Sequence, residues 1–264
     1  MIPTVSIVSM FVSGLLASAL PVVLFLAFRK RYGLKSAPML VGVATFIIFA
    51  MILEQTAHYF ILRPDAEGNI ALMTENFALF TLYGAFAAGI FEESGRFAAF
   101  KLLKKKFAGP ETGFAYGIGH GGIEAVMVCG LSFISSAVIA VMVNRGVAGL
   151  MPDAALETLS NTAPSMFIVG FVERVFAMII HISLSMVVWR AVNKKGNIWL
   201  FPAAIILHAA IDIFPALYQA GAVTSIALVE VMVGGFSLAV AGFAFWLFRK
   251  DARQGREALT TGDE

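Results

Sequence analysis

Charged residues are scarce in this sequence. Only 14% of the 264 residues are Asp, Glu, Lys or Arg, and 59% are hydrophobic. Soluble domains usually contain about a quarter charged residues, so this composition indicates a chain that lies mostly in lipid. The formal net charge is +2, which is too small to indicate a nucleic-acid-binding protein.

Cysteine and several familiar motifs are also lacking. The single cysteine, Cys129, lies in an apolar run, which excludes a disulfide framework and a thiolate metal cluster. No HExxH motif occurs, which excludes a soluble-type zincin. The apolar N-terminal run lacks the basic start of a signal peptide and is interpreted as a retained first span. The sequence has no internal repeats. We therefore predict one membrane domain over residues 1–250 and a short polar cytoplasmic tail over 251–264.

Long apolar runs dominate what the sequence does contain. A helix needs roughly 20 apolar residues to cross about 30 Å of hydrocarbon. Seven runs reach this length, near residues 5–28, 38–62, 76–100, 112–143, 164–189, 198–216 and 222–248. The sequence therefore predicts an all-α bundle of about seven helices surrounded by the lipid bilayer. The fourth run is overlong and is expected to tilt, or to break near Gly130.

Lysine and arginine collect in alternate loops. Four groups hold most of the 19 basic residues, and they lie at 29–35, 101–106, 190–195 and 249–256. Basic residues close to span ends are retained in the cytoplasm. This pattern predicts an N-terminus outside and a C-terminus in the cytoplasm, in an integral protein of a bacterial cytoplasmic membrane.

Ionisable residues interrupt the third to sixth spans. A charge at mid-bilayer costs about 2.5 to 3.5 kcal/mol even on the lenient insertion scale, so each should face the bundle interior and have a partner. They are Glu92, Glu93 and Arg96, then His120 and Glu124, then Glu173, Arg174 and His181, and finally His208 and Asp212. A rise of about 1.5 Å per residue puts one acid and three histidines at one depth, roughly 10 to 15 Å below the cytoplasmic face.

The residue types suggest a metal-dependent hydrolytic site. Metal ligands are predicted at Glu93, His120, His181 and His208. Neutral imidazoles and a carboxylate can bind Zn²⁺ and leave a position for water, whose pKa the ion would lower towards about 7. Catalytic residues are predicted at Glu92, Glu93, Arg96, His120, His208 and Asp212. Supporting residues behind the ligands are predicted at Glu124, Glu173 and Arg174.

Other interpretations of the same residues stay open. Glutamate and histidine could activate water without a metal. Glu92 and Arg96 could form a structural ion pair, and a single intramembrane histidine could be a hydrogen-bonded packing residue. Glu54 and His58 also lie four residues apart, but their span places them near the outer surface. We therefore treat Glu54 and His58 as separate from the main site.

Four motifs taken in order carry a resemblance to a known family. EESGR, YGIGHGGIEA, ERVFAMIIHISLS and HAAID resemble the YhfC-type intramembrane metalloproteases, relatives of the CAAX-prenyl-protease and bacteriocin-processing superfamily. The superfamily signature is a glutamate pair followed by arginine, an aromatic residue four before a histidine, and a histidine four before Asn or Asp. The matching residues are Glu92, Glu93 and Arg96, then Tyr116 and His120, then His208 and Asp212. The resemblance implies hydrolysis of a peptide or membrane protein near the cytoplasmic leaflet.

Two departures from this pattern leave alternatives open. Arg96 follows the glutamate pair one residue sooner than in the usual CAAX-protease motif, so either glutamate could activate water. His181 has no place in the signature, although the YhfC-like stretch around it implies a ligand. Chains of acids and histidines also form ion pathways, so the main alternative function is a metal-ion or proton-coupled transporter. A third possible function is that of a catalytically degenerate membrane scaffold. The sequence favours no oligomeric state.

Overall fold

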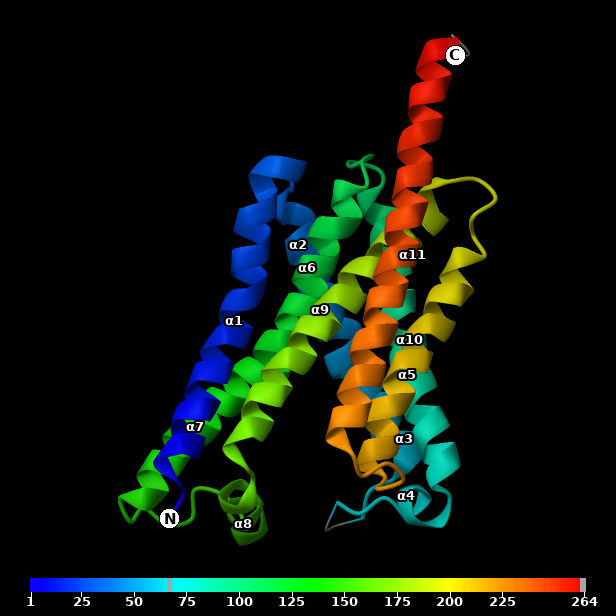
Figure 1. Ribbon diagram of the computed structural model, residues 1–264. Coiled ribbons are helices and arrows are strands. Elements are labelled where there is room, and N and C mark those ends of the chain that lie inside the picture. The colour runs from blue at the N-terminus through cyan, green and yellow to red at the C-terminus, as the bar shows by residue number, and fades with distance from the viewer. Residues whose placement is uncertain (66–67, 262–264) are drawn as a thin grey trace.

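The chain folds into a bundle of long helices (Figure 1). The computed structural model describes the backbone of residues 1–65 and 68–261, and the side chains of these residues up to 250. Within this part the long helical segments are α1 (Thr4–Tyr32), α2–η1–α3 (Ser36–Phe46, Ile47–Glu54, Gln55–Leu62), α5 (Phe77–Leu103), α6–η2–α7 (Glu111–Ala125, Val126–Leu131, Ser132–Asn144), α9 (Pro164–Asn193), α10 (Leu200–Gln219) and α11 (Ile226–Thr261). Two short helices, α4 (Ala71–Glu75) and α8 (Asp153–Asn161), lie in connections. The predicted all-α bundle is confirmed.

Six of the seven long segments are apolar and long enough to cross a membrane. The seventh, α5, is the segment that carries Glu92, Glu93 and Arg96, and it packs most closely against α10. The two ends of the chain lie at opposite ends of the bundle, as expected for an odd number of crossings (Figure 1). Three basic groups lie at or just beyond the ends of α1, α5 and α9, and the fourth lies within α11, where its apolar span ends. We call this end of the bundle the basic end. That the basic end faces the cytoplasm remains a prediction.

Two long segments contain π-helical stretches. The overlong fourth segment does not break near Gly130; it stays helical and widens over η2, where the Ser132 hydroxyl donates to the carbonyl of Met127 at 3.1 Å. A π-helical stretch re-aims the residues that follow it and is often found near functional sites. The last helix also continues beyond its span, because α11 includes the first residues of the predicted polar tail up to Thr261. Residues 262–264 lie outside the described part.

Glycines allow α6 to approach its neighbours closely. A Cβ atom on Gly117 would lie 2.6 Å from the Cα of Ile182 on α9, and one on Gly121 would lie 3.0 Å from the Cβ of His181. On the other side of α6, a Cβ on Gly42 of α2 would lie 2.9 Å from the backbone nitrogen of His120. These contacts fit the small-residue packing of membrane helices, and they bring His120 to the centre of the bundle.

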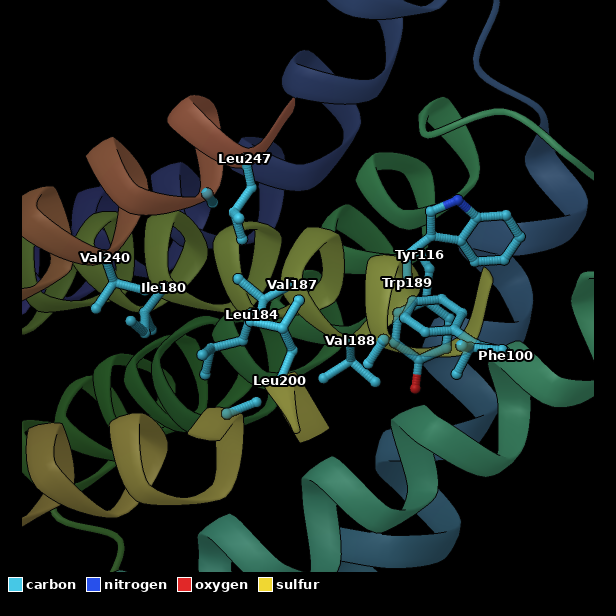
Figure 2. Packing of buried hydrophobic residues seen from close by; sticks show 14 of the residues in the cluster. Phe100, Tyr116, Ile180, Leu184, Val187, Val188, Trp189, Leu200, Val240 and Leu247 are labelled. Carbon is cyan, nitrogen blue, oxygen red and sulfur yellow. The ribbon is translucent and has the colours of Figure 1, made fainter. Parts of the chain in front are cut away.

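A large hydrophobic cluster packs α5, α6, α9, α10 and α11 against one another (Figure 2). On four of these helices, members of the cluster lie on the basic-end side of the polar residue: Phe100 beyond Arg96, Tyr116 before His120, Leu184 beyond His181 and Leu200 before His208. The ring of Phe100 packs against Tyr116 at 4.6 Å and against Trp189 at 5.2 Å between centroids. This close packing separates the ionisable residues from the basic end.

Candidate metal centre

Four helices bring the predicted residues into one buried group. α5 contributes Glu92, Glu93 and Arg96, α6 contributes His120 and Glu124, α9 contributes Glu173, Arg174 and His181, and α10 contributes His208 and Asp212. Glu93, Arg96 and His120 are 0% exposed, and His181 and His208 are 3% and 4% exposed. Each of these ten residues forms an ion pair or a hydrogen bond with at least one other member of the group.

The Glu92 carboxylate lies at the centre of three imidazoles. Its Oε2 atom accepts a hydrogen bond from Nε2 of His120 at 2.8 Å. The same oxygen lies 3.8 Å from Nδ1 of His181 and 3.9 Å from Nε2 of His208. Ring centroids are 5.0 Å apart for His120 and His181, and 5.5 Å for His181 and His208. One nitrogen of each histidine therefore faces the same oxygen atom.

The other nitrogen of each imidazole is held by an oxygen group. Nδ1 of His208 donates to Oε1 of Glu93 at 2.7 Å, and Nε2 of His181 contacts Oε2 of Glu124. Nδ1 of His120 lies 3.4 Å from the hydroxyl of Tyr116. Such contacts fix the orientation of a histidine and select which nitrogen can bind a metal.

Glu93 and Arg96 lie deeper than Glu92. Oε1 of Glu93 accepts hydrogen bonds from both Arg96 and His208, while its Oε2 is buried without a hydrogen-bond partner among the described side chains. Arg96 also donates from Nη2 to Nδ1 of His181 at 3.1 Å. Glu93 is predicted from the sequence as a metal ligand, but in the structure it contacts His208 on the nitrogen that faces away from Glu92. Glu92 takes the central position among the three histidines.

A second ion-pair chain extends away from the basic end. Arg174 donates to Glu124 and to Glu173, and Glu124 in turn contacts His181. This chain fits the supporting role that the sequence predicts for Glu124, Glu173 and Arg174. It also extends the polar group along α9 towards the end of the bundle opposite the basic residues.

A cavity of about 100 Å³ adjoins the histidines. Its polar walls include Glu92, His181, His208 and Asp212, and Oδ2 of Asp212 lies 3.5 Å from Nε2 of His208. The Asp212 side chain is 35% exposed, far more than Glu93 at 0%. Asp212 is therefore the most exposed of the four carboxylates that line this cavity.

Comparisons with known proteins assign the chain to a family. The model of the YhfC intramembrane metalloprotease family matches residues 16–233. The chain belongs to this family. It is also 32% identical over 258 residues to the uncharacterized membrane protein YhfC of Bacillus subtilis. This match covers 94% of the present chain and 98% of the relative. No solved structure matches. The prediction of an integral membrane protein of the bacterial cytoplasmic membrane is thereby confirmed.

The donor set of this YhfC-family chain fits a divalent metal ion. Ligand atoms of Glu92, His120 and His181 all lie within 4.8 Å of one another. The donors of a tetrahedral Zn²⁺ site lie about 3.4 Å apart, given bonds of about 2.1 Å, so the observed 2.8 to 3.9 Å around Glu92 is close. A metal held by His181 through Nδ1 would displace the hydrogen bond from Arg96. The group has five carboxylates but only two guanidinium groups, so a divalent cation would offset two of the three excess negative charges.

Two features of the site were not predicted from the sequence. The ring of Phe46 on α2 packs edge-on against His120 at 5.2 Å, although nothing in the local pattern distinguishes Phe46 from other apolar residues of its span. The cavity wall at Pro215 and Val233 likewise comes from apolar residues of α10 and α11. By contrast, Glu54 and His58 pair with each other at 3.2 Å, and Tyr83 lies 2.9 Å from His58; none of the three lines the cavity.

Proposed function

We propose that this chain is an intramembrane metallo-endopeptidase that hydrolyses a peptide bond of a membrane-embedded substrate. One observation carries the proposal: three histidines from three helices direct one nitrogen each at a buried glutamate carboxylate. Imidazole and carboxylate are the ligands of catalytic zinc sites, which keep a position for water. Membership of the YhfC family supports the same activity.

Glu92, His120 and His181 would hold the ion, with His208 beside them. A bound Zn²⁺ would polarise the scissile carbonyl and lower the pKa of water at the site. Glu93 and Glu124 hold His208 and His181 in orientation through the nitrogens that face away from Glu92. Arg96 neutralises Glu93 in the buried interior. These contacts fix the imidazoles before substrate arrives.

Asp212 is the residue that we assign to proton transfer. Its carboxylate faces the cavity and lies next to His208, so it can accept the proton of an attacking water molecule. The water oxygen then bonds to the carbonyl carbon, the C–N bond breaks, and Asp212 returns the proton to the leaving amine. Glu92 is the metal ligand in this scheme, which separates its role from that of Asp212.

Ion transport is less well supported. A transport path has to continue through the membrane, whereas the hydrophobic cluster around Phe100, Tyr116 and Leu184 fills the bundle on one side of the ionisable residues. A cavity that reaches the site from one side suits a substrate that enters and leaves by the same route.

The assignment of Asp212 is tested by measuring cleavage and metal content together. In proteoliposomes, wild-type protein is expected to cleave members of a set of transmembrane peptides, with cleavage sites read by mass spectrometry. Asp212→Asn should slow cleavage by about 10²- to 10⁴-fold, the usual contribution of a general base, and should retain its metal. Glu75→Gln, at an exposed position of α4, is the control. Wild-type rates in Asp212→Asn would rule out the proton-transfer role, and no cleavage by wild type would contradict the proposed function.

A further inference from the structure

A second cavity of about 230 Å³ adjoins the first between α9, α10 and α11. The two cavities share the wall residues Glu173, Pro215 and Val233. The second cavity extends away from the basic end, along the halves of these helices that lie beyond Arg174. The two cavities therefore lie one after the other along α9, α10 and α11, with the second one farther from the basic end.

The second cavity combines apolar walls with two carboxylates. Its apolar walls include Met166, Val169, Tyr218 and Val229, and its acids are Glu173 and Glu230. Oε2 of Glu230 is buried and has no hydrogen-bond partner among the described side chains. A carboxylate oxygen withdrawn from water is costly unless a donor or a cation meets it.

Little positive charge is available to Glu230 within the two cavities. Among the described residues that line them, Arg174 is the one lysine or arginine. Its two terminal nitrogens donate to Glu124 and Glu173, so Arg174 acts on Glu230 without a direct contact. Glu230 stands on α11, across the cavity from α9, and forms no ion pair with a described lysine or arginine. The cavity is therefore suited to a ligand that brings its own positive charge.

We infer that this cavity is a substrate subsite for a basic side chain, lysine or arginine, of the peptide that is cleaved. Both side chains have an apolar stem and a charged head, which match the apolar walls and Glu230. The inference rests on the proposed function. Glu173 precedes His181 by eight residues, or about 12 Å of helix rise. An extended peptide spans this distance in about three to four residues, so the basic residue should lie that far from the cleaved bond.

The subsite is tested by binding, which does not require cleavage. Full-length protein in vesicles of phosphatidylethanolamine and phosphatidylglycerol is mixed with leucine-rich transmembrane peptides that carry a photo-crosslinker and either one lysine or one norleucine. Wild type should bind the lysine peptide about tenfold more tightly, which corresponds to roughly 1.4 kcal/mol. Glu230→Gln should lose this preference, because the amide carries no charge, and Glu75→Gln should keep it.

Two results would overturn the subsite. One is equal binding of the two peptides by wild type. This result does not depend on whether any variant folds. The other is an unchanged preference for lysine in Glu230→Gln. Cleavage of the same peptides is measured in parallel. A lysine preference without any cleavage supports the subsite and contradicts the endopeptidase proposal, whereas cleavage without a lysine preference does the reverse.

Discussion

Replacing Glu92 by glutamine is expected to abolish metal binding and to slow peptide cleavage by about 10³-fold or more, as expected when the central group of a catalytic site is lost. An amide cannot supply the negative charge that now lies 2.8 to 3.9 Å from three imidazole nitrogens. Glu93→Gln should have a much smaller effect, about 10- to 100-fold, because Glu93 acts through His208. The comparison of the two variants decides which glutamate is central.

The measurement is the cleavage rate of a transmembrane peptide in proteoliposomes, with the metal content of each variant determined alongside. Thermal unfolding of both variants shows whether each has folded. If Glu93→Gln lost metal and activity while Glu92→Gln kept them, the central position assigned to Glu92 would be wrong. Loss of activity with full retention of metal in Glu92→Gln would instead support a role of Glu92 as general base rather than as metal ligand.

Arg96→Met is expected to destabilise the protein by about 3 to 5 kcal/mol, the usual result of removing one partner from a buried ion pair. Arg96 and Glu93 are both 0% exposed, and Arg96 is the guanidinium that contacts Glu93. Without it the Glu93 carboxylate would be left in the bundle interior with only the Nδ1–H of His208 as a donor. The free energy of unfolding in detergent micelles measures this loss.

The double variant Arg96→Met, Glu93→Gln is the matched control for this prediction. Removing both charges eliminates the unpaired carboxylate, so the double variant should be more stable than Arg96→Met alone. Equal stability of the single and double variants would show that Arg96 does not act through Glu93. Its contact with Nδ1 of His181 would then be the more important one.

The spans could be predicted closely from sequence because lipid imposes a simple requirement. Residues exposed to hydrocarbon must be apolar over about 20 positions, and runs such as 164–189 and 198–216 correspond to α9 and α10. Gly113, Gly117 and Gly121, four residues apart in α6, are a sequence pattern typical of close helix packing, which the structure shows for all three. The π-helical stretch η2 could not be predicted, since it lies in an almost uniformly apolar run, where an extra residue in a turn leaves no mark on the sequence pattern.

The arrangement within the site was harder to predict. Helix rise places Glu92 and Glu93 at almost the same depth, but consecutive residues on a helix point about 100° apart. Which of them faces the histidines depends on how α5 is rotated against α6, α9 and α10, and this rotation is a property of the whole bundle. In the sequence Glu230 is merely an acid near a span end, whereas the structure places it on the wall of a cavity that adjoins the site.

The most direct test of the metal centre is the metal content of purified protein, measured by elemental analysis of wild type, His120→Ala and His58→Ala. His58 is the matched control, because it is the one histidine outside the buried group and pairs with Glu54 instead. We predict about one divalent ion per chain in wild type and in His58→Ala, and loss of that ion in His120→Ala, since His120 is one of the three ligands. Equal metal content in His120→Ala and His58→Ala would contradict a metal centre at Glu92, His120 and His181.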